Sequence, residues 1–323
     1  MSMLTRSAFI RLGLMAPLAL PFMTRTTRAR ADDGEASWQS LTDDASRADL
    51  FAKEVIPFGL REEQTGGPVT LAIPPTFNFP DDAKFDRIEN KPRVNSIFGI
   101  DISHHLRTGM DFSLLKSQRV GFVYCKATQG VGFKDSKFGD FWKTLGALPT
   151  GDRVPRGAYH FLSSDSPGKD QADRFLAYLR LHGDIRPGDL PPVLDLEWDV
   201  VAGNPDKWRG RGKQYILDMT LGCLQRLKQS TGRTPIIYTA KAWFGDTTIP
   251  LSEFSKFAGY PIWIADYNNS RKLSEKPAVP AGVKPLIWQF SDRALLAAGY
   301  NSGLDASIFY GTDQEFRAAF GIS

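Results

Sequence analysis

The chain has 323 residues, of which 42% are hydrophobic and 24% are charged. These values are ordinary for a globular protein with a sizeable core, and they exclude a disordered tail, a collagen-like fibre and a small disulfide-stapled scaffold. The formal net charge is +4, but residues 1–31 hold five of the 40 basic residues and no acid, which leaves 35 basic against 36 acidic residues beyond them. A nucleic-acid partner is therefore not expected.

Residues 1–31 have the features of a secretory signal peptide. Arg6 and Arg11 precede the uncharged stretch 12–24, and a small-residue site follows at 29–31. A positively charged start, a short apolar core and an A-x-A site are typical of such a peptide. The core is shorter than the about 20 apolar residues that span a bilayer. We expect a periplasmic or secreted protein with no stable membrane insertion after cleavage; the alternative is an uncleaved amphipathic anchor.

Residues 32–96 differ from the rest and form a predicted N-terminal extension. Residues 45–58 have the pattern of one amphipathic helix. Glycines and prolines then break the segment into loops and short extended pieces. The extension is either packed on the main domain or flexible, and we favour packing over a regulatory or partner-binding role.

From residue 97 onward, strand-like and helix-like segments alternate. Strands are predicted at 97–102, 121–127, 157–161, 192–198, 235–239, 261–265 and 286–290. Helices are predicted at 111–118, 138–148, 169–181 and 213–229. This alternation favours βα units with a parallel sheet, and roughly eight strands in about 220 residues favour a closed α/β barrel of the TIM type. Residues 97–323 are therefore predicted to be one barrel domain.

The two cysteines are predicted to be free thiols. Cys125 lies in an apolar strand-like run and Cys223 in a helical pattern, so both look like small core residues. Pairing in an oxidising compartment is the alternative. No CxxC or Cys/His spacing points to a metal.

Acidic residues follow the apolar runs of three predicted strands. Asp101 ends the first, Asp195 and Glu197 end the fourth, and a later strand around 303–305 is expected to end in Asp305. In such barrels the reactive groups lie at the carboxyl ends of the strands. These four acids are the candidate catalytic residues.

Asp195 and Glu197 are two residues apart in an apolar strand. Because strand side chains alternate, both face the same side, about 6–7 Å apart. Mutual repulsion and loss of hydration raise the pKa of at least one carboxyl, which suits a general acid at neutral pH. Paired carboxylates of this kind carry out glycoside hydrolysis. A solvated strand edge or a set of salt-bridge partners is the alternative interpretation.

A series of short motifs follows in order along the chain. They lie at 99–103, 111–112, 121–130, 135, 138, 157–161, 171–175, 192–197, 261–267, 287–291 and 304–305. The series resembles glycoside hydrolase family 25, the N-acetylmuramidases, over about residues 97–312. The resemblance implies a (βα)5β3 barrel with an acidic groove, and cleavage of the β-1,4 bond between N-acetylmuramic acid and N-acetylglucosamine in peptidoglycan.

The resemblance also implies a role for each acid. Glu197 matches the general acid of the family. Asp195 matches the partner that orients or stabilises the 2-acetamido group of the substrate or the developing cation. Asp101 and Asp305 match the two other groove acids. The chain departs from the family pattern at Gln129, where glutamate is common, at Ser307, where asparagine is common, and at 104–106, where a Tyr-Gln pair is usual.

Aromatic residues at strand ends are candidates for binding sugar rings. Tyr159 and His160 are neighbours in one strand and face opposite ways, and we expect Tyr159 to face the groove and His160 to be a core residue. Trp263, Tyr267 and Trp288 present flat apolar faces that suit stacking on sugars, with a place in the core or the barrel rim as the alternative.

No metal or other cofactor is expected. The pair His104-His105 invites a metal-dependent deacetylase interpretation, but adjacent side chains rarely converge on one ion. The expected partner is a peptidoglycan glycan strand, bound by a monomer. Two alternatives stay open: a catalytically weak barrel that holds glycan and positions a partner on the cell wall, and a hydrolase of chitin-like chains.

Overall fold

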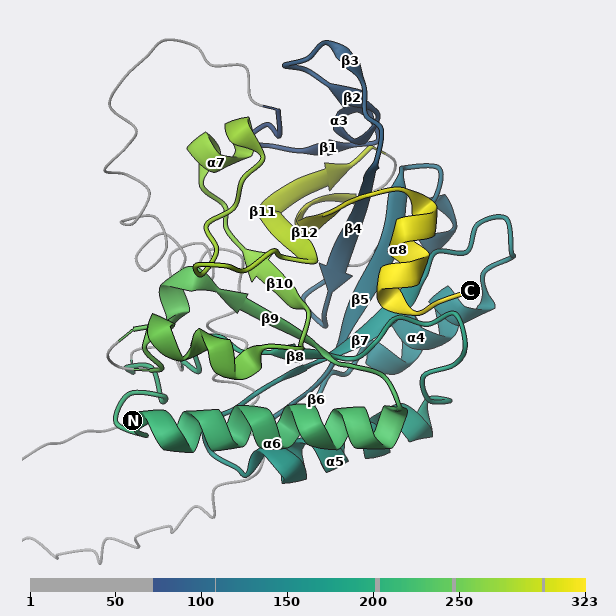
Figure 1. Ribbon diagram of the computed structural model, residues 1–323. Coiled ribbons are helices and arrows are strands. Elements are labelled where there is room, and N and C mark those ends of the chain that lie inside the picture. The colour runs from purple at the N-terminus through teal and green to yellow at the C-terminus, as the bar shows by residue number, and fades with distance from the viewer. Residues whose placement is uncertain (1–71, 108, 201–203, 246–247, 298–299) are drawn as a thin grey trace, which may run out of the picture.

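The computed structural model describes residues 72–323, except 108, 201–203, 246–247 and 298–299. The predicted signal peptide and the predicted helix at 45–58 lie outside these residues. Eight strands close into a barrel (Figure 1), namely β4 Ser96–Ile102, β5 Val120–Gln129, β7 Arg156–Phe161, β8 Val193–Asp195, β9 Ile236–Ala240, β10 Ile262–Ala265, β11 Ile287–Leu296 and β12 Tyr300–Tyr310. This confirms the predicted TIM-like α/β barrel.

The strands are hydrogen-bonded in chain order, and β12 returns to β4 to close the ring. The seven strands from β4 to β11 run parallel, whereas β12 is antiparallel to both of its neighbours. Parallel strands are covered on both faces, which is why β5, β7, β9 and β10 are almost continuously buried.

Three long helices connect the first parallel strands, and they match the predicted helices closely. They are α4 Phe138–Ala147, α5 Gly168–Leu181 and α6 Lys213–Thr231. Helices α5 and α6 pack side by side on the outside of the barrel (Figure 1). The smaller connecting elements are η2 Phe112–Leu114, β6 Phe133–Lys134, η3 Lys241–Trp243, η4 Leu251–Phe257 and α7 Asn269–Ser274.

The helix predicted at 111–118 is wrong. Only the short 3-10 helix η2 forms there. The Asp111 carboxylate caps its start by accepting hydrogen bonds from the Ser113 N–H at 2.9 Å and the Ser113 hydroxyl at 2.6 Å. Such a cap supports the start of a helix, but the residues after Leu114 continue as turns up to Arg119. The chain then leaves the turn through Arg119, whose φ of +68° is left-handed.

Aromatic side chains fill the barrel. The Trp263 ring lies 5.1 Å from Tyr124 and 5.2 Å from Tyr238, measured between ring centroids. At the amino end of the parallel strands, helix α8 Asp313–Phe320 covers the barrel with Phe316, which stacks on Phe122 at 5.6 Å. The interior is thus packed, and the carboxyl ends of the parallel strands are the end left for a site.

The described part of the N-terminal extension packs against the barrel. Strand β1 Asn78–Phe79 pairs with the far end of β11. Phe77 is fully buried, with its ring 4.9 Å from those of both Phe98 and Phe290. Helix α3 Asp81–Lys84 and the short hairpin of β2 Phe85–Asp86 and β3 Lys91–Pro92 complete this segment. Residues 72–79 therefore supply core side chains to the barrel.

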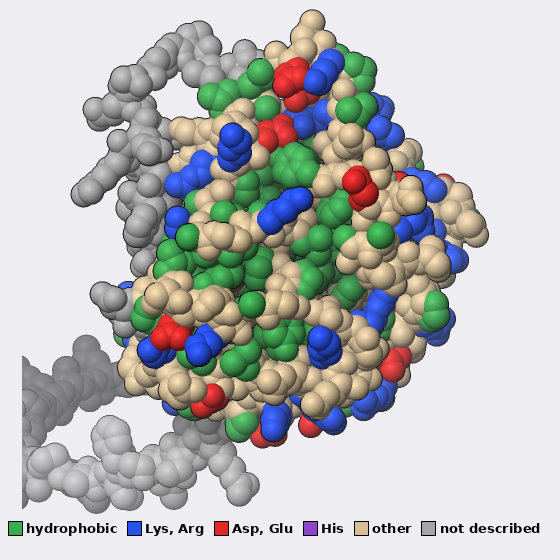
Figure 2. Space-filling model, in the orientation of Figure 1, with side chains coloured by type: hydrophobic (Ala, Val, Ile, Leu, Met, Phe, Trp, Pro, Cys, Tyr) green, Lys and Arg blue, Asp and Glu red, His purple; other side chains and the backbone are tan. Residues whose placement is uncertain are grey.

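Both cysteines are free and buried, as predicted. Burial raises the pKa of each thiol well above its usual value. On the face of the described chain shown in Figure 2, lysines and arginines are scattered among acidic and uncharged residues. Within the described residues, no helix is both long and apolar enough to cross a membrane.

Candidate active site

Asp101 and Asp305 lie opposite each other on neighbouring strands. Asp101 lies near the carboxyl end of β4, and Asp305 in β12 is its direct cross-strand partner. The Asp101 side chain is largely buried, with the residue 6% exposed. The expectation that Asp305 ends a strand is wrong, because it lies in the middle of β12. Since β12 runs antiparallel, its middle reaches the same height as the end of β4.

Asp195 is the last residue of β8, which lies across the barrel from β12 in the closed strand order. Asp101 and Asp195 both line a small pocket inside the barrel mouth, which we call the central pocket. Its other lining residues are Tyr159, Val193, Tyr238 and Trp263. Carboxylates from two separate strands therefore meet over the aromatic interior.

Glu197 lies beyond β8, which is shorter than predicted. The chain stays beside β9 as far as Leu196, whose N–H donates to the Tyr238 carbonyl at 2.9 Å. Glu197 is half-buried, and its backbone carbonyl accepts a hydrogen bond of 2.9 Å from the indole N–H of the fully buried Trp208. The backbone at Glu197 is thus held from both sides.

A network of buried carboxylates holds Asp199 and Asp206, which follow Glu197. The Asp199 carboxylate accepts from the Ser163 hydroxyl at 2.9 Å and the Ser164 N–H at 2.7 Å, both in the loop after β7. The Asp206 carboxylate accepts from the N–H groups of Asp199 at 3.0 Å and Trp208 at 3.2 Å. Burial raises the pKa of Asp206 to about 6, against the lowering effect of these hydrogen bonds.

Gln289 connects Asp101 to two tyrosines at the floor of the site. Its side-chain N–H donates to the Asp101 carboxylate at 2.7 Å, and its carbonyl accepts from the hydroxyls of Tyr238 at 2.7 Å and Tyr267 at 2.6 Å. Gln289 is fully buried on β11. Because the amide N–H donates to Asp101 and the amide oxygen accepts from both tyrosine hydroxyls, the amide has one orientation and holds Asp101 in place.

The aromatic candidates are divided between the site and the rest of the protein. Tyr159 and Trp263 line the central pocket, and the Trp263 indole donates to the Ser307 hydroxyl at 3.1 Å. Tyr267 is half-buried and bound to Gln289. Trp288 precedes Gln289 in β11 and therefore faces the opposite side of the strand, away from the barrel interior. It is 1% exposed, and its indole N–H donates to the Asp266 carbonyl at 2.8 Å. Trp288 is therefore a packed residue outside the barrel mouth.

The structure places His160 in the core. Its ring is fully buried, with Nδ1 2.8 Å from the Thr128 hydroxyl and Nε2 3.2 Å from the Gln171 side-chain carbonyl. Burial lowers the His160 pKa to about 4, so the ring is neutral near pH 7.

His104, the first of the histidine pair, is bound to Asp135. The Nδ1 atom of His104 lies 2.9 Å from the carboxylate of the fully buried Asp135, which also accepts the His104 N–H at 2.8 Å. Within the part of the chain that the structure describes, no three His, Cys, Asp or Glu side chains gather as metal ligands. Gln129, a departure from the family pattern, accepts a hydrogen bond from Lys126 at 2.9 Å.

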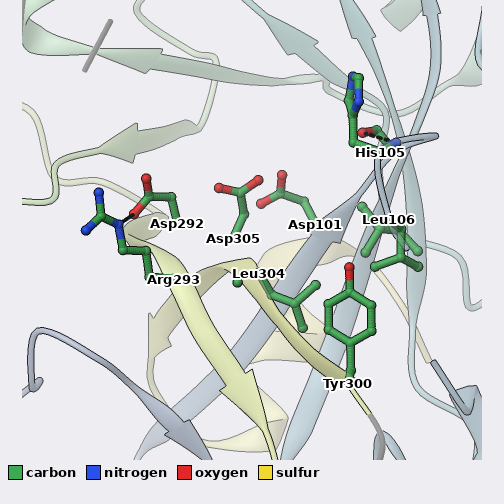
Figure 3. Close-up of a pocket in the computed structure, with 11 residues that line it drawn as sticks. Asp101, His105, Leu106, Asp292, Arg293, Tyr300, Leu304 and Asp305 are labelled. Atoms are coloured by element: carbon green, nitrogen blue, oxygen red, sulfur yellow. Dashed lines mark hydrogen bonds and ion pairs between the residues drawn. The ribbon is translucent and has the colours of Figure 1, made fainter. Parts of the chain in front are cut away.

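A second pocket, of about 190 Å³, opens beside Asp101 and Asp305, and we call it the rim pocket (Figure 3). Its lining residues are Asp101, Ile102, Ser103, His105, Leu106, Asp292, Arg293, Tyr300, Gly303, Leu304 and Asp305. Sequence reasoning missed Asp292, Arg293 and Tyr300, which lie beyond the predicted strand 286–290. The available sequence signal for this part of the site was the charged pair Asp292-Arg293, which follows the motif at 287–291 directly.

A closed α/β barrel with acids gathered at the carboxyl ends of its strands is the arrangement of a barrel glycoside hydrolase. The sequence profile described as "Glycosyl hydrolases family 25" matches residues 100–298. The chain is 32% identical over 235 residues to an N,O-diacetylmuramidase of Arthroderma benhamiae, covering 71% of this chain and 89% of that one. It therefore belongs to glycosyl hydrolases family 25 and is a glycoside hydrolase.

Other similar proteins support the same family assignment. Lysozyme M1 of Streptomyces globisporus is 30% identical over 230 residues, which cover 68% of this chain and 69% of that protein. The structure of a muramidase from Acremonium alcalophilum superposes with a TM-score of 0.57 at 29% identity, covering 69% of this chain and 97% of the other. The structure of a bacterial lysozyme from Streptomyces coelicolor superposes with a TM-score of 0.57 at 27% identity, covering 69% of this chain and 96% of the other.

Proposed function

We propose that the protein is an exported muramidase, which cleaves the β-1,4 bond between N-acetylmuramic acid and N-acetylglucosamine in peptidoglycan. The observation that carries this proposal is the meeting of Asp101, Asp195 and Asp305 at one end of a family 25 barrel, with Glu197 held two residues beyond Asp195. The names of the relatives, N,O-diacetylmuramidase and lysozyme, support the choice of substrate.

In this proposal Glu197 is the general acid. It protonates the glycosidic oxygen as the bond breaks, so that the departing sugar leaves as a neutral alcohol. The hydrogen bond from Trp208 to the Glu197 carbonyl and the Asp199–Asp206 network fix the backbone that presents this carboxyl. Such fixing matters because a proton transfer requires the acid to lie within hydrogen-bonding reach of the bond.

The three aspartates then stabilise positive charge on the sugar. Asp195 is the nearest acid along the chain and assists by orienting the 2-acetamido group or by facing the cation that develops. Asp101 and Asp305 extend the negative field from the opposite wall. Because these side chains are mostly shielded from water, their effect on a cation is stronger than it is at a surface. Tyr159 and Tyr267 supply flat walls for the sugar rings, and the buried Trp263 lines the central pocket next to Tyr159.

Export is supported by the charge pattern, apolar core and A-x-A site of residues 1–31. We therefore place the mature protein in the periplasm or outside the cell, where peptidoglycan is accessible.

The test is digestion of purified peptidoglycan, followed by loss of turbidity and release of soluble fragments. We expect Glu197→Gln to digest peptidoglycan about a thousandfold more slowly, because an amide cannot donate the proton. Glu89→Gln is the matched control, since Glu89 is an exposed residue between β2 and β3; it should digest like the wild type. Equal digestion by Glu197→Gln would contradict the role of Glu197. Glycan binding without fragments, in the wild type as well, would favour the binding-only barrel.

A further inference from the structure

Strand β11 has a bulge directly opposite Asp305. Ser291 pairs with Ala306 and Ala294 pairs with Leu304, so Asp292 and Arg293 together oppose the single residue Asp305. A bulge of this kind turns side chains away from the regular alternation, and bulges are frequent beside active sites. The Ser291 hydroxyl accepts the Arg293 N–H at 3.1 Å and stabilises the bulged backbone.

Gly303 on β12 makes room for the bulge. A Cβ atom at this position would lie 3.0 Å from the Asp292 carbonyl oxygen and 3.2 Å from the Arg293 Cα. Because both neighbours are backbone atoms, they cannot rotate away from a larger residue. The close approach at Gly303 therefore allows Asp292 and Arg293 to enter the wall of the rim pocket.

The bulge places a cation among the acids. Figure 3 shows Asp292 and Arg293 on one side of the adjacent Asp305 and Asp101 carboxylates. The Arg293 side chain is 69% exposed, and its Nε lies 3.7 Å from the Asp292 carboxylate. An acid-lined groove repels an anionic substrate group, and a guanidinium at its edge reverses that repulsion locally.

The charge of Asp292 is shared with a second cation. Lys272 on α7 is 3% exposed, and burial lowers its pKa to about 8, while the negative charges of Asp292 and Asp266 oppose that lowering. The Asp292 carboxylate therefore interacts electrostatically with both Lys272 and Arg293. The exposed guanidinium keeps positive charge for a ligand in the pocket.

We propose that Arg293, positioned by the bulge and by Asp292, binds a carboxylate of the glycan substrate in the rim pocket. This inference rests on the proposed function. In a peptidoglycan strand, carboxylates occur only at the muramic residues, either as the free lactyl group or on the peptide attached to it. The planar guanidinium suits a carboxylate because it can donate two parallel hydrogen bonds. Arg293 therefore selects muramic-containing strands over neutral chitin-like chains.

The test is binding, measured by calorimetry in the Glu197→Gln background so that no ligand is cleaved. Three ligands are compared: strands stripped of peptide with free lactyl carboxylates, strands that keep their peptides, and neutral N-acetylglucosamine oligomers. We expect Arg293→Ala to weaken binding of at least one carboxylate-bearing strand about tenfold and to leave the neutral oligomers unchanged. The strand that is weakened identifies the source of the carboxylate.

Two further variants sharpen the result. Arg293→Lys should recover part of the affinity, because lysine keeps the charge but not the two parallel donors. Arg226→Ala is the matched control, since Arg226 is an arginine of α6 on the outside of the barrel and pairs with Asp173; it should bind like the parent. Three results would overturn the inference. Arg293→Ala could lose the same affinity for neutral and carboxylate-bearing ligands, it could lose no affinity for any ligand, or the parent could bind no strand at all. Failure of the wild type to digest peptidoglycan would instead contradict the proposed function.

Discussion

Replacing Gln289 by glutamate tests the electrostatics of the site most sharply. The substitution keeps the shape of the side chain but puts a second carboxylate oxygen where the amide nitrogen lies, 2.7 Å from the Asp101 carboxylate. Gln289 is fully buried and Asp101 is 6% exposed, so water screens the pair weakly. Two carboxylates at this distance share one proton, which raises one pKa by about 2–3 units.

The expected cost follows from that shift. One pKa unit corresponds to about 1.4 kcal/mol, so Gln289→Glu should lose about 3–4 kcal/mol of folding free energy near pH 7.5. The folded state holds the extra proton above pH ~4.3, where the unfolded chain releases it, so the loss grows as pH rises from there. Near pH 4 the variant should be within about 1 kcal/mol of the wild type.

The assay is urea unfolding of both proteins at several pH values. Gln129→Glu is the matched control, because it adds the same charge at another buried position, one that faces Lys126 at 2.9 Å. There the new carboxylate gains a cation, its pKa falls, and stability relative to the wild type should rise with pH. A Gln289→Glu penalty that is the same at pH 4 and pH 7.5 would refute the hydrogen bond from Gln289 to Asp101.

Three other substitutions test separate parts of the structure. His160 has a pKa of about 4 when folded and about 6.5 when unfolded, so the wild type should lose about 3 kcal/mol as pH falls from 6.5 to 4, and His160→Gln should lack that loss. Gly99→Ala should destabilise the fold by about 3 kcal/mol, because a Cβ there would lie 2.3 Å from the Phe122 ring. Trp208→Phe removes the donor to the Glu197 carbonyl, and should lower kcat about tenfold with little change in KM.

Each of the three has a result that counts against it. The same acid-induced loss in His160→Gln would mean that another group titrates. Gly132→Ala serves as the control for Gly99, since nothing lies within 4 Å of a Cβ at that position; equal effects would argue against the steric explanation. Unchanged kcat in Trp208→Phe, measured by steady-state kinetics, would show that Glu197 needs no support from the indole.

Much of the barrel follows from local pattern. The buried parallel strands are continuous apolar runs, and the amphipathic helices α4, α5 and α6 begin and end within about two residues of their predicted bounds. The four candidate catalytic acids could be predicted from the sequence because each interrupts or follows an apolar run. Motif order then supplied the family resemblance, which the profile match and the relatives confirm.

The remaining features depend on contacts between distant residues. The direction of β12 is fixed by its pairing with β4 and β11, and local sequence does not encode it. The extended length of β11 and its bulge depend on Gly303, eleven positions beyond Asp292 along the chain. Gln289 reads as one polar residue in an apolar strand, and its bonds to Asp101, Tyr238 and Tyr267 appear only once the barrel closes.

The central claim is the identity of the bond that is cut, and the reducing ends of the products report it directly. Purified peptidoglycan digested by the mature protein would be reduced with borohydride and analysed by mass spectrometry, with Glu197→Gln in parallel. The account predicts new ends that carry N-acetylmuramitol, absent from the Glu197→Gln digest. New ends that carry N-acetylglucosaminitol, or the same muramitol ends in both digests, would contradict it.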